Sequence, residues 1–531
     1  MLQILANGKG RAVRNSPGTI SYEPPRPTLA RGSWLVFAAV LLGQAAFFYY
    51  VSQHRLVDDD EGFYLLASRL VLQHRTPYLD FFYTQAPLLP YVFGAWLKLF
   101  GVTWFSGRAF CALLATGVGC LMYAHVRRET GRRLSGAVAV LLFASSTLVF
   151  AWYPIVKTFA LAMLFLFPAY MVLSRLSPSM PGWLVGAAGA LFALSVDTRS
   201  YIVALAPVLL WWLLRKQAGA RLRWLAWFGG GFVIGILPSL ILFFASPDAF
   251  LFNNLGYHAL RSGSGLIGNW HDKMMVVAAI FGGAYTGFQF TALTLIALGL
   301  LIFLRPRRGS SLLAVLLAIV LGAVSLLPTP ASIQYFSLLM PFLIVAAVCS
   351  ANDYLGRLQS PSKAGLARAL CAALVVAFIA FAAPVFRQYL FTGRKVPGLR
   401  DMADAPNWTL ERLTQVSQAV DELAQPGEQV LSFFPGYLFA TRAAPYPGME
   451  NNFGMWVAPD LSAAKREQYH LITAPDAARA LAGHETRLVV VSSNQGDWNA
   501  ELDYAACVAA LRAYGYRQVR QIGDIYIYAV S

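Results

Sequence analysis

The chain has 531 residues, of which 57% are hydrophobic and only 13% are charged, and its formal net charge is +16. Soluble domains carry about 25% charged residues, so this composition excludes an ordinary soluble protein and indicates a membrane protein with many spanning helices. The basic residues gather in short loops between apolar runs. This pattern is typical of membrane topology and of contact with anionic lipids, not with nucleic acid.

The N-terminal residues 1–33 are polar and include five basic residues. They lack the pattern of a cleavable signal peptide, and Pro24, Pro25 and Pro27 oppose a helix. We expect a disordered cytoplasmic tail. The first spanning helix is predicted at 34–51 and runs outward, because the basic tail precedes it.

The apolar run 88–100 is short for a span and contains Pro90 and Lys98, so it is predicted to be an interfacial helix. The next span, 105–126, then runs inward and places the arginines at 127–133 in the cytoplasm. Further spans are predicted at 134–152, 158–174, 183–197, 200–214, 224–245, 276–304, 311–328, 336–355 and 365–386. The result is about eleven spans, with the C-terminus outside.

The C-terminal residues 387–531 are more polar, and helical and strand patterns alternate along them. Helices are predicted at 411–425, 476–481 and 503–514, and strands at 429–434, 488–492 and 524–530. We expect a small α/β domain at the outer face. The segment shows no nucleophile–base pair of its own, and the whole chain shows no phosphate-binding loop and no metal-type Cys/His spacing.

Four consecutive carboxylates, Asp58 to Glu61, follow the first span. Anionic headgroups repel such a cluster, and burial of the charges in hydrocarbon is costly. Two interpretations are open. The carboxylates line a wet cavity and perform acid–base chemistry, or they cap the helix expected at 62–73, since carboxylates favour a helix N-terminus.

Asp60-Glu61-Gly62-Phe63-Tyr64 resembles the Asp-Glu-x-x-Tyr pattern in the first outer loop of the GT-C glycosyltransferases, in particular those of family 39. Gln85-Ala86-Pro87-Leu88-Leu89 is similar to the Lys-Pro-Pro-Leu-Leu of lipid A aminoarabinose transferases and the His-Pro-Pro-Leu of protein O-mannosyltransferases. Further motifs follow in the same order: Leu99-Phe100-Gly101-Val102, Arg108, His258-Ala259-Leu260-Arg261, Gln334-Tyr335 and Pro341.

The resemblance implies an all-α GT-C membrane core at 34–386 with a peripheral periplasmic α/β domain at 387–531. It implies transfer of a monosaccharide from a polyprenyl monophosphate, undecaprenyl or decaprenyl phosphate in a bacterium, at the outer face of the inner membrane. The acceptor is a cell-envelope glycan, a lipid or a protein. No cofactor is predicted, and nothing in the sequence supports a divalent metal.

A departing lipid phosphate calls for cations and hydrogen-bond donors. The resemblance assigns Arg261 to this role, and its planar fork suits phosphate. The family's lysine before Pro-Pro is replaced by Gln85, which is expected to contact the substrate and can donate a hydrogen bond but carries no charge. We therefore expect Lys157 to supply the missing charge, with Tyr335 as a further donor; the alternative for Lys157 is a lysine that reaches the lipid surface.

Asp60 is the predicted general base for an acceptor hydroxyl, which leads to inversion at the sugar, and Glu61 is expected to orient or support it. Clustered carboxylates raise one another's pKa, which can move one of them toward a value useful for a base. Asp58 and Asp59 lie next to Asp60 and remain candidates for the base. If the acceptor is a phosphate, no base is needed, and the carboxylates position sugar hydroxyls instead.

Tyr64 and His258 are expected to contact substrate, whereas Asp197 and Arg199 are expected to pair with each other. Two other classes of function remain open: a flippase for lipid-linked sugars and a non-catalytic assembly partner. Internal repeats, common in alternating-access carriers, are not visible in the sequence.

Overall fold

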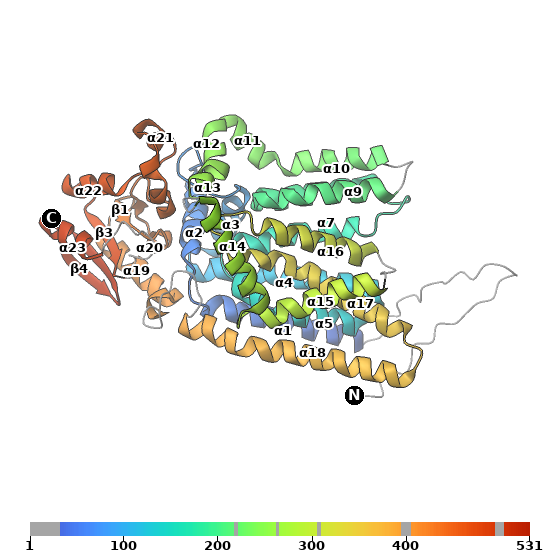
Figure 1. Cartoon of the computed structure of the whole chain (residues 1–531). Coiled ribbons are helices and arrows are strands. Elements are labelled where there is room, and N and C mark those ends of the chain that lie inside the picture. The colour runs from blue at the N-terminus through green and yellow to red at the C-terminus, as the bar shows by residue number, and fades with distance from the viewer. Residues whose placement is uncertain are drawn as a thin grey trace.

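The structure is a computed structural model that describes residues 32–216, 221–261, 265–304, 309–393, 405–493 and 504–530. Residues 1–31 of the expected N-terminal tail lie outside the described residues. The described chain forms a bundle of roughly parallel helices with a smaller domain at one end (Figure 1).

The bundle contains the long helices and several shorter apolar ones. These elements are α1 (Gly32–His54), α4 (Trp104–Thr130), α5 (Arg133–Ser145), α6 (Thr147–Trp152), α7 (Thr158–Leu173), α8 (Gly182–Thr198), η2 (Ser200–Leu205), α9 (Ala206–Lys216), α10 (Arg221–Gly235), α11 (Leu237–Ala245), α14 (Gly265–Gly282), α15 (Gly287–Leu304), α16 (Gly309–Val324), η5 (Ile333–Leu339), α17 (Met340–Arg357), α18 (Pro361–Arg387) and η6 (Gln388–Thr392).

The described residues contain four helices long and apolar enough to cross a membrane, or up to six if each bent pair forms one span. Six shorter apolar helices of the bundle region accompany them. Their positions follow the predicted apolar runs, but the number of about eleven spans stays a prediction.

Three segments expected to be single spans are broken. A bend of 81° separates α14 from α15, and one of 56° separates α10 from α11, where Pro238 lies in the first turn. The segment 134–152 is divided into α5 and α6. At this break the buried Gln289 amide accepts from the Thr147 N–H (2.8 Å) and donates to the Ser145 carbonyl (2.9 Å), so it satisfies backbone groups that a continuous helix would pair.

One end of the bundle is built from short helices and loops between α1 and α4 and between α11 and α14. They include α2 (Asp59–Leu72), α3 (Leu88–Phe100), α12 (Pro247–Leu251), η4 (Phe252–Gly256) and α13 (Tyr257–Leu260). Helix α3 has the bounds predicted for the interfacial helix. These elements lie next to the C-terminal domain (Figure 1).

The C-terminal domain is a mixed α/β unit, as the alternating patterns predicted. Its five-stranded sheet has the order β2-β1-β3-β5-β4, in which β1 is parallel to β2 and β3, and β5 is antiparallel to β3 and β4. The strands are β1 (Gln429–Ser432), β2 (Ala444–Pro445), β3 (Leu488–Ser492), β4 (Arg517–Ile522) and β5 (Ile525–Ala529). The sequence patterns did not predict β2 or β4.

Helices and short turns surround this sheet. They are η7 (Ala405–Trp408), α19 (Leu410–Leu423), α20 (Gly436–Phe439), η8 (Asn452–Trp456), η9 (Ala458–Asp460), α21 (Ala463–Gln468), α22 (Ala474–Ala482) and α23 (Tyr504–Ala513). Strand β3 is buried along its whole length and lies between β1 and β5, so the core of the domain is centred on it.

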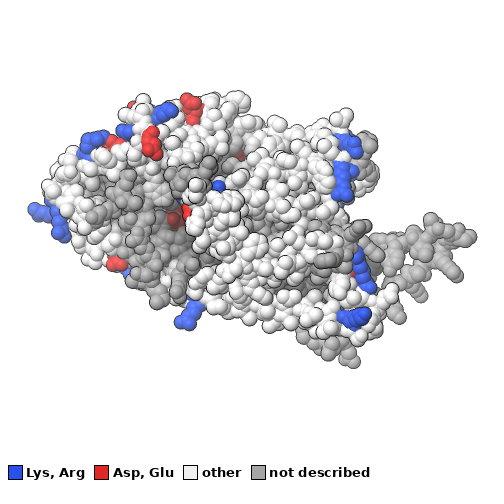
Figure 2. All heavy atoms as spheres, viewed as in Figure 1, with Lys and Arg blue, Asp and Glu red and all other residues white. Residues whose placement is uncertain are grey.

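Charged side chains divide the visible surface of the molecule into zones. Figure 2 shows a broad belt without charge over the bundle, a cluster of Lys and Arg at the end away from the C-terminal domain, and mixed charges on that domain. A belt of this kind is what a lipid-embedded surface requires, because a charged side chain in hydrocarbon is costly.

Candidate active site

A cavity of about 260 Å³ lies where the short helices at one end of the bundle meet the C-terminal domain. Seven of the eight residues predicted for the site line it: Asp60, Tyr64, Gln85, Lys157, His258, Arg261 and Tyr335. These residues come from five separate stretches of sequence. The fold therefore gathers them into one place, as the sequence predicted.

The acidic end of α2 is held by a capping box. The Asp58 side chain accepts from the Asp60 N–H (3.2 Å), while Glu61 Oε1 accepts from the Asp58 N–H (2.8 Å). Carboxylates at these positions satisfy backbone donors that the first turn leaves unpaired. The capping interpretation of the cluster is thus correct for Asp58 and Glu61.

Glu61 is fully buried and does not line the cavity. Arg108 donates to both of its oxygens, through Nε (2.5 Å) and Nη2 (2.7 Å), and the Val156 N–H donates to Oε2 (2.9 Å). Such a bidentate pair is strong and directional. Glu61 therefore fixes the start of α2 and does not contact the cavity, and its expected support of Asp60 in the reaction stays a prediction.

Lys157 is buried at the N-terminus of α7, and its ammonium group has three oxygen partners. These are Asp58 Oδ1 (2.6 Å), Asp60 Oδ2 (2.7 Å) and Gln334 Oε1 (2.6 Å). Burial alone lowers the pKa of Lys157, but the carboxylates of Asp58, Asp60 and Asp59 outweigh that effect and raise it. Lys157 is therefore a charged group that holds the carboxylate cluster together.

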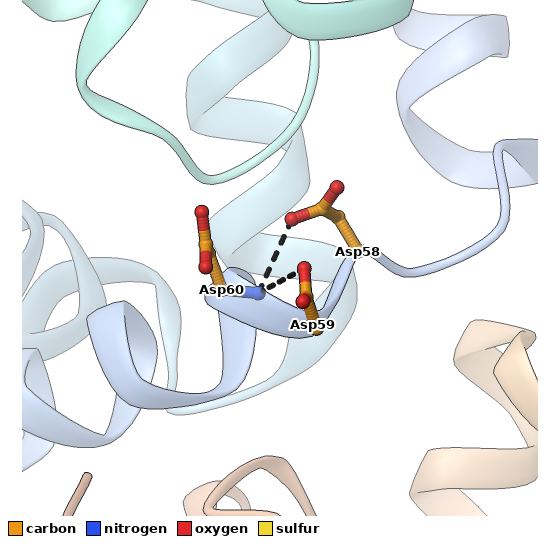
Figure 3. Close-up of side chains that lie close together, drawn as sticks. All are labelled: Asp58, Asp59 and Asp60. Atoms are coloured by element: carbon orange, nitrogen blue, oxygen red, sulfur yellow. Dashed lines mark hydrogen bonds between the residues drawn. The ribbon is translucent and has the colours of Figure 1, made fainter. Parts of the chain in front are cut away.

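The carboxylates of Asp58, Asp59 and Asp60 lie close to one another at the start of α2 (Figure 3). One oxygen from each lies within 4.8 Å of the others, close enough to share a cation. Burial, with the negative charges of Asp58 and Asp60, raises the pKa of Asp59 well above its usual range. These three residues would hold a metal if one bound; in the structure the cation between Asp58 and Asp60 is Lys157.

His258 and Arg261 also line the cavity. The imidazole of His258 lies 3.1 Å from the Thr84 carbonyl, to which its Nε2–H donates. Burial, together with the positive charges of Arg261 and Arg199, lowers the pKa of His258 to about 4. His258 is therefore neutral at physiological pH. The Arg261 guanidinium lies over the ring of Trp456, 5.0 Å from its centroid.

The structure adds Arg199 to the site. Its guanidinium donates to Thr158 Oγ1 (2.5 Å) and lies against the rings of Phe159, Tyr201 and Tyr335, between 4.5 and 5.0 Å from their centroids. Asp197 instead accepts from the hydroxyl of Ser239. The expected pair between Asp197 and Arg199 is therefore wrong, because the chain turns at Arg199 and the two side chains have different partners.

Similarities to three kinds of known protein bear on this arrangement. The family model described as dolichyl-phosphate-mannose-protein mannosyltransferase matches residues 84–244. Crystal structures of ArnT from Cupriavidus metallidurans, bound to undecaprenyl phosphate and in the apo state, match with a TM-score of 0.65 each. Their sequence identities are 16% and 14%, and both matches cover 94% of this chain and 98% of ArnT.

The chain has the GT-C fold. The arabinofuranosyltransferase AftD from Mycobacteria, a mutant form seen by cryo-EM, matches with a TM-score of 0.51 and 16% identity over 94% of this chain and 41% of AftD. No curated protein matches the sequence. The expected resemblance to GT-C glycosyltransferases is confirmed at the level of the fold.

The cavity is also lined by residues that sequence reasoning did not assign to it. Arg199 was assigned to an ion pair, and Phe453 and Trp456 come from the C-terminal domain, for which no motif was found. An arginine at the end of an apolar run was the signal available for Arg199. No local pattern indicates that Phe453 and Trp456 reach the cavity.

Proposed function

We propose that the protein is a membrane glycosyltransferase that moves a monosaccharide from a polyprenyl phosphate to a cell-envelope acceptor at the outer face. One observation carries the proposal: Asp60 shares a cavity with Lys157, Arg199 and Arg261 at the end of the bundle that faces the C-terminal domain. Acidic and cationic groups thus meet where an activated sugar and its phosphate would lie. The fold of ArnT and the family match at 84–244 support the same reaction class.

The cationic side of the cavity suits the phosphate of the donor. Cleavage of the sugar–phosphate bond leaves negative charge on the lipid phosphate, and aimed cations stabilise that charge. Arg261 and Arg199 present guanidinium groups, which match phosphate oxygens in pairs. Tyr335, whose ring is 5.0 Å from the Arg199 guanidinium, adds a hydroxyl donor. We therefore assign the donor phosphate to this side.

The acidic side suits the acceptor. Asp60 lines the cavity and its side chain is 27% exposed, whereas the Asp58 side chain is fully buried. Asp60 is therefore better placed to accept a proton from an acceptor hydroxyl, with Asp59 as the neighbouring alternative. Attack of that hydroxyl on the anomeric carbon, with departure of the lipid phosphate, is a single displacement with inversion at the sugar.

A reconstituted assay tests the proposal. Purified protein in liposomes is given undecaprenyl phosphate carrying a labelled sugar, together with envelope acceptors. Transfer of the label to an acceptor is the expected result. Movement of the labelled lipid across the bilayer without transfer would assign the protein to the flippases. If neither transfer nor lipid movement is seen with any acceptor class, the role of an assembly partner is left.

Substitution of Asp60 tests its role within that assay. Asp60→Asn keeps an oxygen for Lys157 but removes the base, so we expect kcat to fall about 10²- to 10⁴-fold while the affinity for the donor changes little. Asp248→Asn, an exposed carboxylate of α12 outside the cavity, is the matched control. Full activity of Asp60→Asn with a hydroxyl acceptor would remove the base role.

A further inference from the structure

The C-terminal domain supplies part of the cavity wall. Phe453 and Trp456, both in η8, line the cavity, whereas every other lining residue lies between positions 59 and 335. The Phe453 ring packs edge-on against Phe63 of α2, with centroids 5.7 Å apart, and lies 5.0 Å from the Trp456 ring. The domain is therefore in direct contact with the surface on which substrate would bind.

The contacts between this domain and α2 are extensive and well defined. Arg69, buried near the end of α2, donates to the carbonyls of Leu438 (2.8 Å), Thr441 (2.6 Å) and Ala443 (3.0 Å). At the other end, the Val57 N–H donates to the Trp408 carbonyl (2.6 Å). Because both ends of α2 are joined to the domain, the distance between η8 and the carboxylate cluster is fixed.

The position of η8 itself is also restricted. Asn451 caps it, accepting from the Phe453 N–H (3.2 Å). Gly454 lies so close to its neighbours that an added Cβ would come within 3.1 Å of the Phe82 ring and closer still to Leu471. Trp456, which follows two residues later, is therefore presented to the cavity by a rigid turn.

The partner of Trp456 is the arginine that we assign to the donor phosphate. The Arg261 guanidinium lies 5.0 Å from the centroid of the Trp456 ring. Among the described residues no carboxylate forms an ion pair with Arg261. The ring of Trp456 and the hydroxyl of Tyr257 lie beside its guanidinium, and neither neutralises the charge. A cation held over a ring keeps its hydrogen-bond donors available at the edge of the guanidinium plane.

We propose that Trp456 is a positioning residue that holds Arg261 for the phosphate of the lipid carrier, so that the C-terminal domain takes part in donor binding. This inference rests on the proposed function. It assigns to the C-terminal domain a part in binding the lipid donor, in addition to any contact that the domain makes with the acceptor.

Direct binding of undecaprenyl phosphate to the full-length protein in detergent tests this proposal, separately from transfer. A cation–π contact is worth about 0.5–2 kcal/mol, so Trp456→Ala should weaken binding about 2- to 30-fold, and Trp456→Phe should retain most of the affinity. In transfer assays the KM for the donor should rise, with the KM for the acceptor unchanged. Trp183→Ala, an exposed tryptophan of α8, is the matched control.

A double-mutant cycle decides whether Trp456 acts through Arg261. We expect Trp456→Ala to have little further effect on lipid binding in an Arg261→Ala background. An equal loss in both backgrounds, or an undiminished affinity of Trp456→Ala in the wild-type background, would overturn the inference. Wild-type protein that binds the lipid but transfers no sugar would refute the proposed function alone. Wild-type protein that binds no lipid would refute both.

Discussion

The ammonium group of Lys157 lies between two carboxylates, which are partners that the sequence analysis did not predict for it. Lys157 was expected to contact the donor phosphate, yet its three hydrogen-bond partners are Asp58, Asp60 and Gln334. A buried lysine with this set of partners balances the charge of the acidic cluster. Its direct action on the phosphate stays a prediction, and the two roles are separable by mutation.

Replacing Lys157 with methionine leaves buried carboxylates without their cation. Breaking a buried ion pair costs about 3–5 kcal/mol, so the melting temperature of Lys157→Met should fall clearly, and transfer should fall with it. The double variant Asp58→Asn/Lys157→Met removes one negative charge and should recover much of the stability.

The double variant distinguishes the two roles of Lys157. If thermal unfolding recovers while donor affinity and transfer stay low, Lys157 acts on the phosphate as well as on the cluster. Recovery of both would restrict it to charge balance. Wild-type stability and transfer in the single Lys157→Met variant would contradict the buried ion pairs themselves.

His258 makes the stability of the protein depend on pH. Its pKa is lowered from 6.5 to about 4, so an unfolded chain takes up a proton as the pH falls below 6.5 while the folded chain does not. Stability due to His258 is therefore present above pH 6.5 and is lost toward pH 4. Between pH 7 and pH 5 the loss is on the order of 1–2 kcal/mol.

Melting temperatures of wild type and His258→Gln at pH 7 and pH 5 measure this contribution. Glutamine can still donate to the Thr84 carbonyl but does not titrate, so the variant should lose less stability on acidification. An equal loss in the two proteins would show that His258 is not held neutral by its surroundings.

Much of the candidate site was predictable because its residues stand out locally. Asp60, Gln85 and Arg261 are polar residues beside apolar runs in an ordered set of motifs, and the cavity contains all three. Trp456 was not predictable, since an aromatic residue in a polar segment is usual. Its role depends on how α2 and the C-terminal domain pack, and that contact between distant segments leaves no local pattern.

At the scale of elements, the close approach of α2 to α20 sets the position of the acidic cluster. Gly62 follows Glu61 on α2, and a Cβ added there would lie 2.6 Å from the Gly436 nitrogen and 2.8 Å from the Phe434 ring. The first of these is a backbone atom and cannot rotate away. The absence of a side chain at Gly62 therefore permits the contact between bundle and domain.

Gly62→Ala should force α2 away from α20. Overpacking of this kind costs about 1–3 kcal/mol, so we expect a lower melting temperature and slower transfer. Gly43→Ala is the matched control, because a Cβ at this position of α1 meets nothing within 4 Å and alanine favours a helix by up to about 1 kcal/mol. Equal melting temperatures for the two variants would contradict the close contact.

Helix positions were predictable from apolar runs, whereas breaks within them were not. Helix α3 has the expected bounds. Helix α7 ends one residue earlier than expected, and α8 begins one residue earlier and ends one residue later than expected. The break between α5 and α6 depends on Gln289, which lies more than 130 residues away along the chain. A run of apolar residues carries no information about such a distant partner.

At the scale of the molecule, α4 connects the two ends. Trp104 at its start packs edge-on against Phe439 of the C-terminal domain, with centroids 5.6 Å apart. Arg127 and Arg128 lie in its last turn, roughly 35 Å further along at 1.5 Å per residue. That length matches the hydrocarbon core of a bilayer, and a basic end is typical of the cytoplasmic side. We therefore expect the C-terminal domain outside and the loop after α4 inside.

Cysteine labelling tests this orientation. The five native cysteines are first replaced, and one new cysteine is then introduced in each of two variants. Val519→Cys lies on β4, where the valine is 45% exposed, and Leu134→Cys lies on α5, where the leucine is 65% exposed. A membrane-impermeant maleimide applied to spheroplasts should label the cysteine at 519 at once and the cysteine at 134 only after lysis.

Because α4 joins the two regions as one rigid helix, they must lie on opposite sides of any bilayer that the belt in Figure 2 occupies. Labelling of both sites in intact spheroplasts would contradict the span, and the reverse order would place the cavity in the cytoplasm, where it would meet the carrier on the wrong face for envelope acceptors.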